Sequence, residues 1–325
     1  MIHGHQGSRD TRFDLVVVLT LVVANATLCQ GQELARAVHV TAENDHFNFW
    51  QPPQQRSDDN YSQGVRLGWD VVGAPSVARR VICGRSVSCA STLEFGQEMY
   101  TPTLDAATPI PGQRPYAGWL YVRGGVVAAT ARTHRAVDAT FGVTGRASLA
   151  GQIQEIAHSF YPRFHQPLGW SHQLPSEPDF AVQFRQSWYL GSSGAGAHWA
   201  DVVPEAYATI GTLRTALGGG GQLRIGFDVD HPWLVDAPAR PLAVFLFLGA
   251  RGEAVGRDLF LDGSTFHRSG SVPRVPFISD WERGVDFRLW RLGAEYRAIT
   301  QGREYRPGPG THTYSGITVT WWTVR

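Results

Sequence analysis

The sequence predicts an all-β protein, a transmembrane antiparallel β-barrel of about twelve strands with a short helix in a loop region. Apolar and polar residues alternate with period two in segments of roughly ten residues, separated by turn residues. The chain of 325 residues is rich in Gly (36), Phe (16) and Trp (11), and only 18% of its residues are charged. No central apolar run is long enough to cross a bilayer as a helix.

The N-terminus has the pattern of an export signal. A basic stretch precedes an apolar run from Leu15 to Leu28, and Ala24-Asn25-Ala26 offers small residues for cleavage. We therefore expect a signal peptide over residues 1–26, ending between 26 and 31, followed by one barrel domain over residues 27–325.

Two cysteines lie close together in the predicted exported chain. Cys83 and Cys89 are separated by five residues in a turn-like segment. Because an exported protein meets an oxidising compartment, we expect a local disulfide of structural importance.

The predicted strands follow the alternation along the chain. Clear alternation occurs at Val38–Ala42, Val65–Val71, Leu93–Met99, Val137–Val143, Val182–Leu190 and Leu223–Phe227, and in weaker form at Phe287–Ile299 and Ser315–Val324. Less regular candidates are Tyr116–Thr130, Asp201–Leu213 and Pro241–Leu261, of which the last is long enough for a hairpin. The tally is about twelve, an even number as bacterial outer-membrane barrels have.

A soluble β-sandwich would also tolerate many short alternating strands. Two features favour the membrane barrel. Aromatic pairs cluster near strand ends, at Trp119 and Tyr121, at Trp188 and Tyr189, and at Trp321-Trp322, as expected of interfacial girdles. The second face of many strands carries Arg, Glu, Gln and Gly, where a sandwich core needs apolar residues. A formal net charge of +1 with dispersed bases gives no electrostatic case for nucleic acid.

One segment has helical periodicity. Within residues 148–160, Leu149, Ile153 and Ile156 fall on one side, whereas Gln154 and His158 fall on the opposite side. We expect a helix in the loop region that presents its polar side to a ligand.

Polar side chains gather where two predicted strands end. Glu43-Asn44-Asp45 closes one strand, and Tyr61-Ser62-Gln63 opens the next. Consecutive strand residues point to opposite faces, so the consecutive side chains of this triplet can hardly point at one ion, and we assign only Asp45 as a metal ligand.

The chain resembles the lipid A 3'-O-deacylase family of outer-membrane barrels over most of its predicted mature length. The segments that carry the resemblance are END at Glu43–Asp45, DDNYSQGVRLGW at Asp58–Trp69, GQEMYTPT at Gly96–Thr103, RPYAGWLYV at Arg114–Val122, GVTGRASLAGQIQEIAH at Gly142–His158, PLGWSHQLPSEP at Pro167–Pro178 and DGSTFHRSGSV at Asp262–Val272. Ser62 stands where the family usually has Thr, and Gln113 stands where relatives commonly have an acidic residue.

The resemblance implies a twelve-stranded barrel in the bacterial outer membrane, with a site facing the external leaflet. It also implies Ca²⁺-dependent hydrolysis of the ester that joins the 3' acyloxyacyl chain to the disaccharide of lipid A. Carried over by motif, the functional residues are Asn44, Asp45, Ser62 and His158. Lipid A in the membrane is then the partner, and we expect a monomer.

The residue types suit this chemistry. Asp45 offers a hard oxygen for Ca²⁺, Asn44 can donate to the developing oxyanion, and His158 can act as general base. Ser62 either positions the attacking water or is itself the nucleophile, and we favour activated water because of the resemblance. Arg114 is expected to bind a lipid A phosphate or to form a structural ion pair, and Gln154 to assist substrate binding beside His158. An esterase acting on glycerophospholipid and a porin-like barrel are the alternatives.

Overall fold

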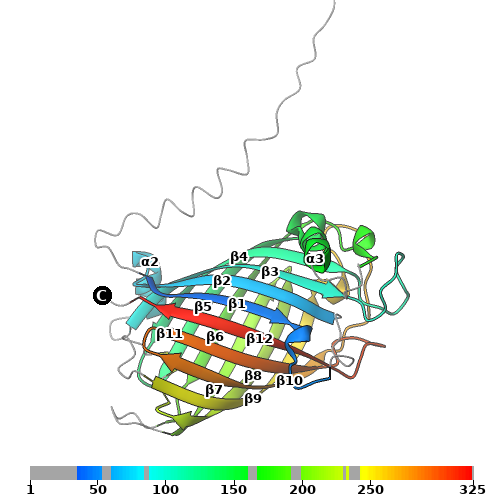
Figure 1. Cartoon of the computed structure of the whole chain (residues 1–325). Helices are drawn as coiled ribbons and strands as arrows, with labels where there is room; N and C mark the ends of the chain where they lie inside the picture. The colour runs from blue at the N-terminus through cyan, green and yellow to red at the C-terminus, as the bar shows by residue number, and fades with distance from the viewer. Residues whose placement is uncertain are drawn as a thin grey trace, which may run out of the picture. The chain divides into compact units, whose positions relative to one another are not determined.

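The structure is a computed structural model that describes residues 35–52, 60–83, 88–159, 167–191, 199–229, 232–233 and 242–323. The predicted signal peptide lies outside these residues. The described strands form one closed antiparallel barrel in which each strand pairs with its neighbours in sequence and β1 pairs with β12 (Figure 1). They are β1 (Ala35–Asn44), β2 (Asn60–Val72), β3 (Ser88–Thr101), β4 (Ala117–Ala129), β5 (Thr133–Thr144), β6 (Pro178–Trp188), β7 (Ala200–Gly211), β8 (Arg214–Phe227), β9 (Leu242–Asp258), β10 (Phe277–Leu289), β11 (Leu292–Gly302) and β12 (Thr311–Trp322).

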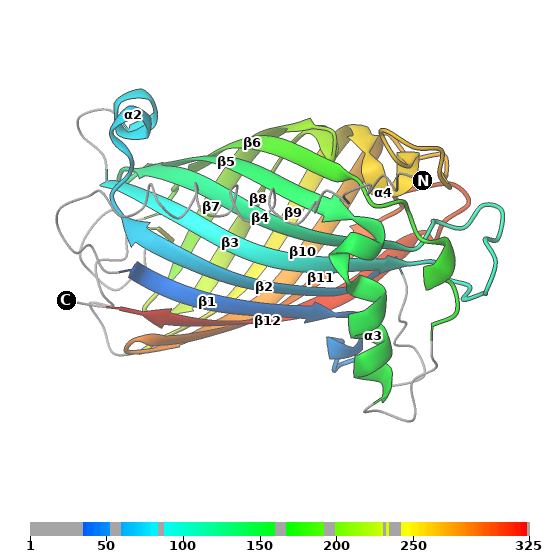
Figure 2. The same ribbon diagram turned by 90° about the horizontal axis from the view of Figure 1, so that it is seen from above.

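Short helices occupy the connections at both ends of the barrel (Figures 1 and 2). They are η2 (Asp45–Phe47), α2 (Ser76–Ala78), η4 (Arg79–Cys83), η5 (Gly145–Ser148), α3 (Ala150–Ser159), η6 (Trp170–His172) and α4 (Leu259–Asp262). Among the described residues, none of these helices is long and apolar enough to span a membrane. We call the end that carries η2, α3 and α4 the loop end, and the end where β1 begins and β12 stops the terminal end.

The predicted fold class is confirmed, although two strands were assigned wrongly. The expected hairpin at Pro241–Leu261 is the single long strand β9, which ends in α4. The expected strand at Phe287–Ile299 contains the end of β10, a tight turn at Trp290 and the start of β11. The two errors cancel in the number of strands. Both arise because periodicity alone does not show where a long strand ends and a two-residue turn begins.

Strand alternation separates an apolar outer face from a polar lumen. On β9, Leu246 and Leu248 are 64% and 53% exposed, whereas Phe245 and Phe247, which alternate with them, are buried. An apolar band on the outside of a barrel is the surface that contacts lipid. Trp188 and Trp321 are exposed as girdle residues should be, whereas Tyr189 is buried, and so are Trp119 and Tyr121. The rings of Trp119 and Tyr121 stack at 3.9 Å, and both are buried, so the prediction that they belong to a girdle is wrong.

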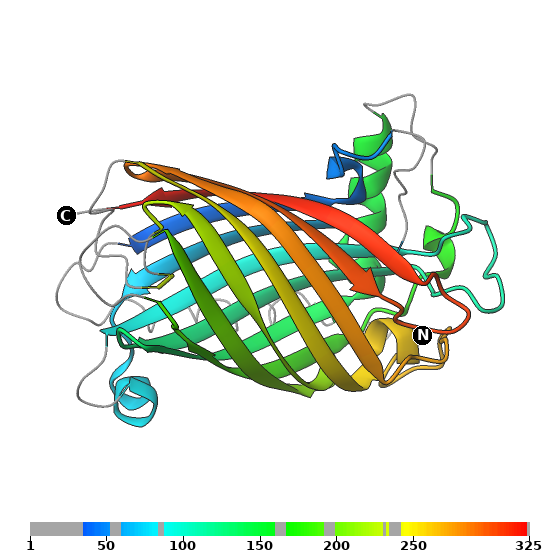
Figure 3. The ribbon, with the colours of Figure 1, turned by 90° about the horizontal axis from the view of Figure 1, so that it is seen from below.

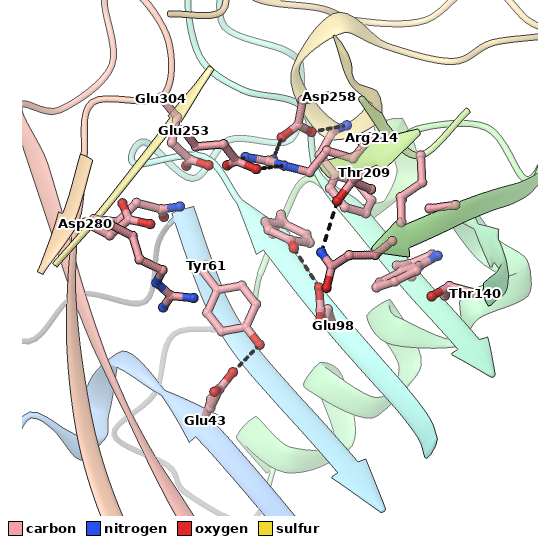
Figure 4. A pocket seen from close by; sticks show the side chains of 18 of the residues that line it. Glu43, Tyr61, Glu98, Thr140, Thr209, Arg214, Glu253, Asp258, Asp280 and Glu304 are labelled. Atoms are coloured by element: carbon pink, nitrogen blue, oxygen red, sulfur yellow. Dashed lines mark hydrogen bonds and ion pairs between the residues drawn. The ribbon is translucent and has the colours of Figure 1, made fainter. Parts of the chain in front are cut away.

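The lumen holds a network of ion pairs, among them those of Arg214 with Glu253 and Asp258 (Figure 4). Arg66 contacts Glu43 and lies 3.7 Å from Glu98, and Arg297 Nη1 lies 2.8 Å from Glu282 Oε2. These charges are partly removed from water, so each needs its partner to remain ionised. A cavity of ≈ 360 Å³ remains between them, lined on several sides by residues such as Tyr61, Thr140, Thr209 and Asp280.

Apolar side chains cross the lumen near the loop end. Phe260 on α4 stacks on Tyr100 of β3 with ring centroids 4.3 Å apart, and it meets Trp119 of β4 edge-on at 6.0 Å. Because α4 follows β9, these contacts join opposite walls of the barrel. They place aromatic rings across part of the lumen at this level, beside the cavity, which is unfavourable for a continuous water-filled channel.

Candidate active site

The β1–β2 pairing brings Asn44 and Ser62 to neighbouring positions at the loop end. Asn44 is directly opposite Gln63, the residue after Ser62. On β1, Val40 is 48% exposed on the outer face, whereas Glu43 lines the lumen cavity. Because side chains alternate along a strand, Asn44 lies on the outer face with Val40. The candidate site is therefore on the bilayer side of the wall, not in the lumen.

A β-bulge places Ser62. The register between β2 and β3 shifts between Tyr61 and Gln63, so Ser62 is the extra residue of the bulge. Tyr61 remains in the lumen, where its hydroxyl donates to Glu43 Oε2 at 2.6 Å (Figure 4). Ser62 Oγ lies 2.6 Å from Thr101 Oγ1, and both residues are buried.

Sequence analysis did not find Thr101. It lies on β3 in the same alternation as Phe95, which is 45% exposed on the outer wall, so Thr101 also belongs to the outer face. The sequence signal that could have indicated Thr101 was its position at the end of the GQEMYT block, level with the start of β2. The pairing register that makes it the partner of Ser62 could not be read without coordinates.

Asp45 begins η2, which folds back over the outside of β12 (Figure 1). Asn48 Nδ2 donates to Thr313 O at 2.6 Å, and Ser315 Oγ donates to Asn48 Oδ1 at 2.6 Å, so the turn is fixed to β12. Asp45 is completely buried, and its Oδ1 lies 3.3 Å from His46 Nδ1.

Asn44 caps this helical turn. Its Oδ1 accepts a hydrogen bond from His46 N at 2.7 Å. The contact orients the amide plane, so that the donors on Nδ2 point away from the turn. A fixed amide of this kind is suited to donate to an oxyanion.

The helix α3 stands against the outside of β3 and β4 (Figure 2). A Cβ atom at Gly118 of β4 would overlap Ala150 and Ser148, so only glycine permits this close approach. Gln97 Nε2 of β3 donates to Ser148 O at 2.6 Å. His158 is half-buried in the last turn of α3, at the same barrel end as Asn44, Asp45 and Ser62.

The polar side of α3 faces the protein, and its apolar side is exposed. Gly151 and Gln154 are buried, whereas Ile153 and Ile156 are 38% and 57% exposed. Gln154 Oε1 accepts from Trp170 Nε1 at 2.7 Å, which fixes η6 to the helix. The reason is the position of α3 outside the barrel, where the apolar side faces lipid and the polar side faces protein.

Arg114 is separated from the outer site by the barrel wall. It is 1% exposed, its Nη1 donates to Glu304 Oε2 at 3.0 Å, and its guanidinium lies over the ring of Tyr100. Of the two roles that the sequence left open for Arg114, this contact is the structural ion pair. Burial raises the pKa of the Glu304 carboxyl, and the charge of Arg114 opposes that rise.

The available ligands for a metal are oxygens. Among the described residues, no three His, Cys, Asp or Glu side chains gather into a metal-binding group. Asp45 contributes a fully buried carboxylate, with the amide of Asn44 next to it in the chain. An oxygen donor set with a single carboxylate fits a hard cation such as Ca²⁺ only if backbone carbonyls and waters complete the shell.

These features define a class: an integral β-barrel protein with amide, carboxylate, hydroxyl and imidazole groups at the loop end, outside the lumen. A family model described as "Outer membrane protein LpxR" matches residues 15–323. The chain belongs to this family of outer-membrane lipid A deacylases. It is therefore a hydrolase of the bacterial outer membrane.

A solved structure supports this fold. LpxR from Salmonella typhimurium is similar with a TM-score of 0.74 at 17% identity, covering 88% of this chain and 100% of that chain. The translocator domain of the autotransporter NalP from Neisseria meningitidis is similar with a TM-score of 0.43 at 10% identity, covering 95% and 94%. A search of curated proteins gives no match.

Proposed function

We propose that this protein removes the 3' acyloxyacyl chain of lipid A by hydrolysis at the outer wall of the loop end. The observation that carries the proposal is the outward orientation of Asn44 next to Ser62, which makes the site reachable from the bilayer without passing the lumen. Family membership supports lipid A as the substrate.

The exposed side of α3 supports access of a lipid. Ile153 and Ile156 are exposed on the helix that carries His158, and Leu149, directly before that helix, is exposed as well. Apolar side chains on a helix at the membrane surface lie among acyl chains. A lipid ester at the same depth can therefore approach His158 laterally.

The reaction consists of one addition and one elimination. His158 takes a proton from water, and the water oxygen bonds to the ester carbon. Asn44 Nδ2 donates to the oxyanion of the tetrahedral intermediate. The bond from the ester carbon to the sugar oxygen then breaks, and the sugar oxygen takes the proton from His158. The products are a free 3' hydroxyl and a carboxylic acid.

Ser62 and Asp45 have supporting roles in this proposal. The hydroxyl pair of Ser62 and Thr101 holds the attacking water in line with the carbonyl. Asp45, with backbone oxygens, would hold Ca²⁺, which when bound polarises the ester carbonyl as a Lewis acid.

Purified protein acting on lipid A vesicles with Ca²⁺ tests the proposal, with mass spectrometry of the lipid as readout. We expect loss of one acyloxyacyl unit, abolished by chelation. His158→Ala should slow the reaction about 10²- to 10⁴-fold, and Asn44→Ala about 10²- to 10³-fold. His172→Ala is the matched control, because His172 is an exposed histidine at the same end of the barrel, on η6. Hydrolysis of glycerophospholipid alone would support the esterase alternative, and intact lipid would exclude both enzymes.

A further inference from the structure

The connection between β2 and β3 folds back over the outside of the barrel at the terminal end (Figures 2 and 3). Cys89 of β3 is directly opposite Ala128 of β4. Ala128 alternates with Leu120, which is exposed on the outer wall, so both Cys89 and Ala128 face outward. The disulfide between Cys83 and Cys89, which the sequence predicted, therefore fixes α2 and η4 to the bilayer side of the wall.

The inner side of this helical segment packs on the wall. Ile82 and Cys83 form a small apolar cluster with Val126 and Ala128, both of β4. The segment is thus fixed twice, by the covalent bond and by apolar contact. It does not extend freely into solvent.

The opposite side of the segment is apolar and exposed. Val77 and Val81 are 71% and 78% exposed. They are four residues apart, so they lie on the same side of a helix. Arg79 and Arg80 are exposed beside them, and the segment from Gly73 to Cys83 contains no acidic residue.

We propose that residues 76–83 form an interfacial anchor, in which Val77 and Val81 insert into the lipid leaflet at the terminal end and Arg79 and Arg80 bind anionic phospholipid phosphates. Continuity with the lipid-facing wall selects a membrane as the occupant, because Val126 and Ala128 beneath the segment belong to that wall. The positive charge of a segment that has no acidic residue of its own selects an anionic headgroup. The leaflet is the glycerophospholipid one, an assignment that rests on the proposed lipid A site at the opposite end.

Nitroxide labels measure the depth of the segment in the full-length protein. Val77→Cys and Val81→Cys would be labelled separately in a Cys29→Ser background, with the Cys83–Cys89 disulfide intact, and reconstituted in phosphatidylglycerol vesicles. Collision rates with oxygen, which partitions into lipid, and with a water-soluble nickel chelate give the readout. Leu248→Cys on the outer wall is the lipid reference, and Ala131→Cys in the exposed turn between β4 and β5 is the reference for water at the same end.

We expect the ratio of oxygen to nickel collisions at both valine positions to approach that of Leu248 and to exceed that of Ala131 severalfold. Nickel accessibility equal to that of Ala131 at both positions would overturn the anchor and would indicate a protein partner or bare solvent instead.

A separate experiment tests the two arginines. In the Val81→Cys protein, Arg79→Gln with Arg80→Gln should lower the collision ratio in phosphatidylglycerol to the value found in phosphatidylcholine. Arg291→Gln, in the exposed turn between β10 and β11 at the same end, should leave it unchanged. An unchanged ratio in the double variant would overturn headgroup binding. The depth of the labels is measured without catalytic turnover. The anchor can therefore fail its test while lipid A hydrolysis is observed, and hydrolysis can fail while the anchor is confirmed.

Discussion

Ser62 is the residue on which the proposed water mechanism and an acyl-enzyme mechanism differ most. A nucleophilic serine needs a base within hydrogen-bond reach, and the partner seen at 2.6 Å is the hydroxyl of Thr101, which is not a base at neutral pH. The pairing instead suits two hydroxyls that together hold a water. This favours the activated-water mechanism over an acyl-enzyme.

Replacing Ser62 separates the two mechanisms. We expect Ser62→Ala to lower kcat about 10- to 100-fold, because water is held less well but the base and the oxyanion donor remain. Thr101→Val should have a similar effect, and Ser62→Thr should retain activity. Mass spectrometry of the protein during turnover provides the check. A loss of about 10⁶-fold in Ser62→Ala, together with an acylated Ser62 in the wild-type protein, would contradict the water mechanism.

At the residue scale the sequence predicted part of the site. Asn44 and Ser62 were selected because one motif closes a strand and the other opens the next strand. The pairing of these two strands confirms that the residues are neighbours. Thr101 was missed because its partner depends on the strand register. The catalytic roles of Asn44, Ser62 and His158, and metal binding by Asp45, stay predictions.

At the scale of secondary-structure elements, Glu177, which lies just before β6, joins two loops. Its carboxylate accepts from Thr265 N at 2.7 Å and from Phe266 N at 3.1 Å, and it contacts Ser264 Oγ. Burial raises the pKa of Glu177, but these hydrogen bonds outweigh burial and lower it below its ordinary value of 4.5. The ionised carboxylate thus clamps the segment after α4 to the connection before β6.

The clamp gives a pH dependence with a definite sign. Because the folded-state pKa is lowered, its stabilisation is fully present above about pH 4.5 and is lost as the pH falls through the folded-state value. The protection of residues 264–267 against hydrogen exchange, measured relative to the intrinsic rate at each pH, should therefore fall in acid in the wild-type protein. In Glu177→Gln, these amides should exchange about tenfold or more faster than in the wild-type protein already at pH 7.

Glu155→Gln, a substitution on the exposed side of α3, is the matched control for the clamp. It should leave exchange at residues 264–267 unchanged at every pH. Equal protection of this segment in Glu177→Gln and wild type at pH 7 would show that the loop is held by other contacts.

The helix α3 shows that an amphipathic pattern locates a helix without showing which of its sides meets the protein. Its periodicity gave the helix, and the spacing of Ile153 and Ile156 gave an apolar side. Which side faces protein depends on whether the surroundings are water or lipid, and local periodicity contains no information on that point.

The exposed side of α3 predicts a difference between two assay conditions. Ile153→Ser with Ile156→Ser should lower deacylation in lipid A vesicles about tenfold, because insertion of the helix into the leaflet weakens. Activity on lipid A dispersed as mixed detergent micelles should change less than twofold. Equal losses in both conditions would indicate that these residues act on the fold of the site and not on membrane insertion.

For the whole molecule, the sequence was sufficient to predict a closed barrel because alternation, turns and an export pattern all agree. It could not show that the lumen is crossed by rings, because Tyr100 and Phe260 belong to strands and helices far apart in sequence. The same limit explains the wrong assignment of Trp119 and Tyr121 to a girdle, since aromatics at a strand end look alike whether they face lipid or lumen.

The crossed lumen predicts low conductance. Wild-type protein in planar bilayers should pass little current, whereas Tyr100→Ala with Phe260→Ala should raise conductance severalfold by opening the loop end. Trp188→Ala, which removes an exposed outer aromatic, is the control and should change nothing. Large, stable channels in the wild-type protein would favour the porin-like alternative.

Crosslinking to the substrate tests most directly whether lipid A is bound on the outside of the wall. A photoreactive benzophenone side chain would replace Ile153 on the exposed side of α3 or Gln183 in the lumen cavity, each in the inactive His158→Ala protein in lipid A vesicles. We predict a lipid A adduct at position 153 and little or none at position 183. Adducts at position 183 with none at position 153 would contradict an outward-facing site.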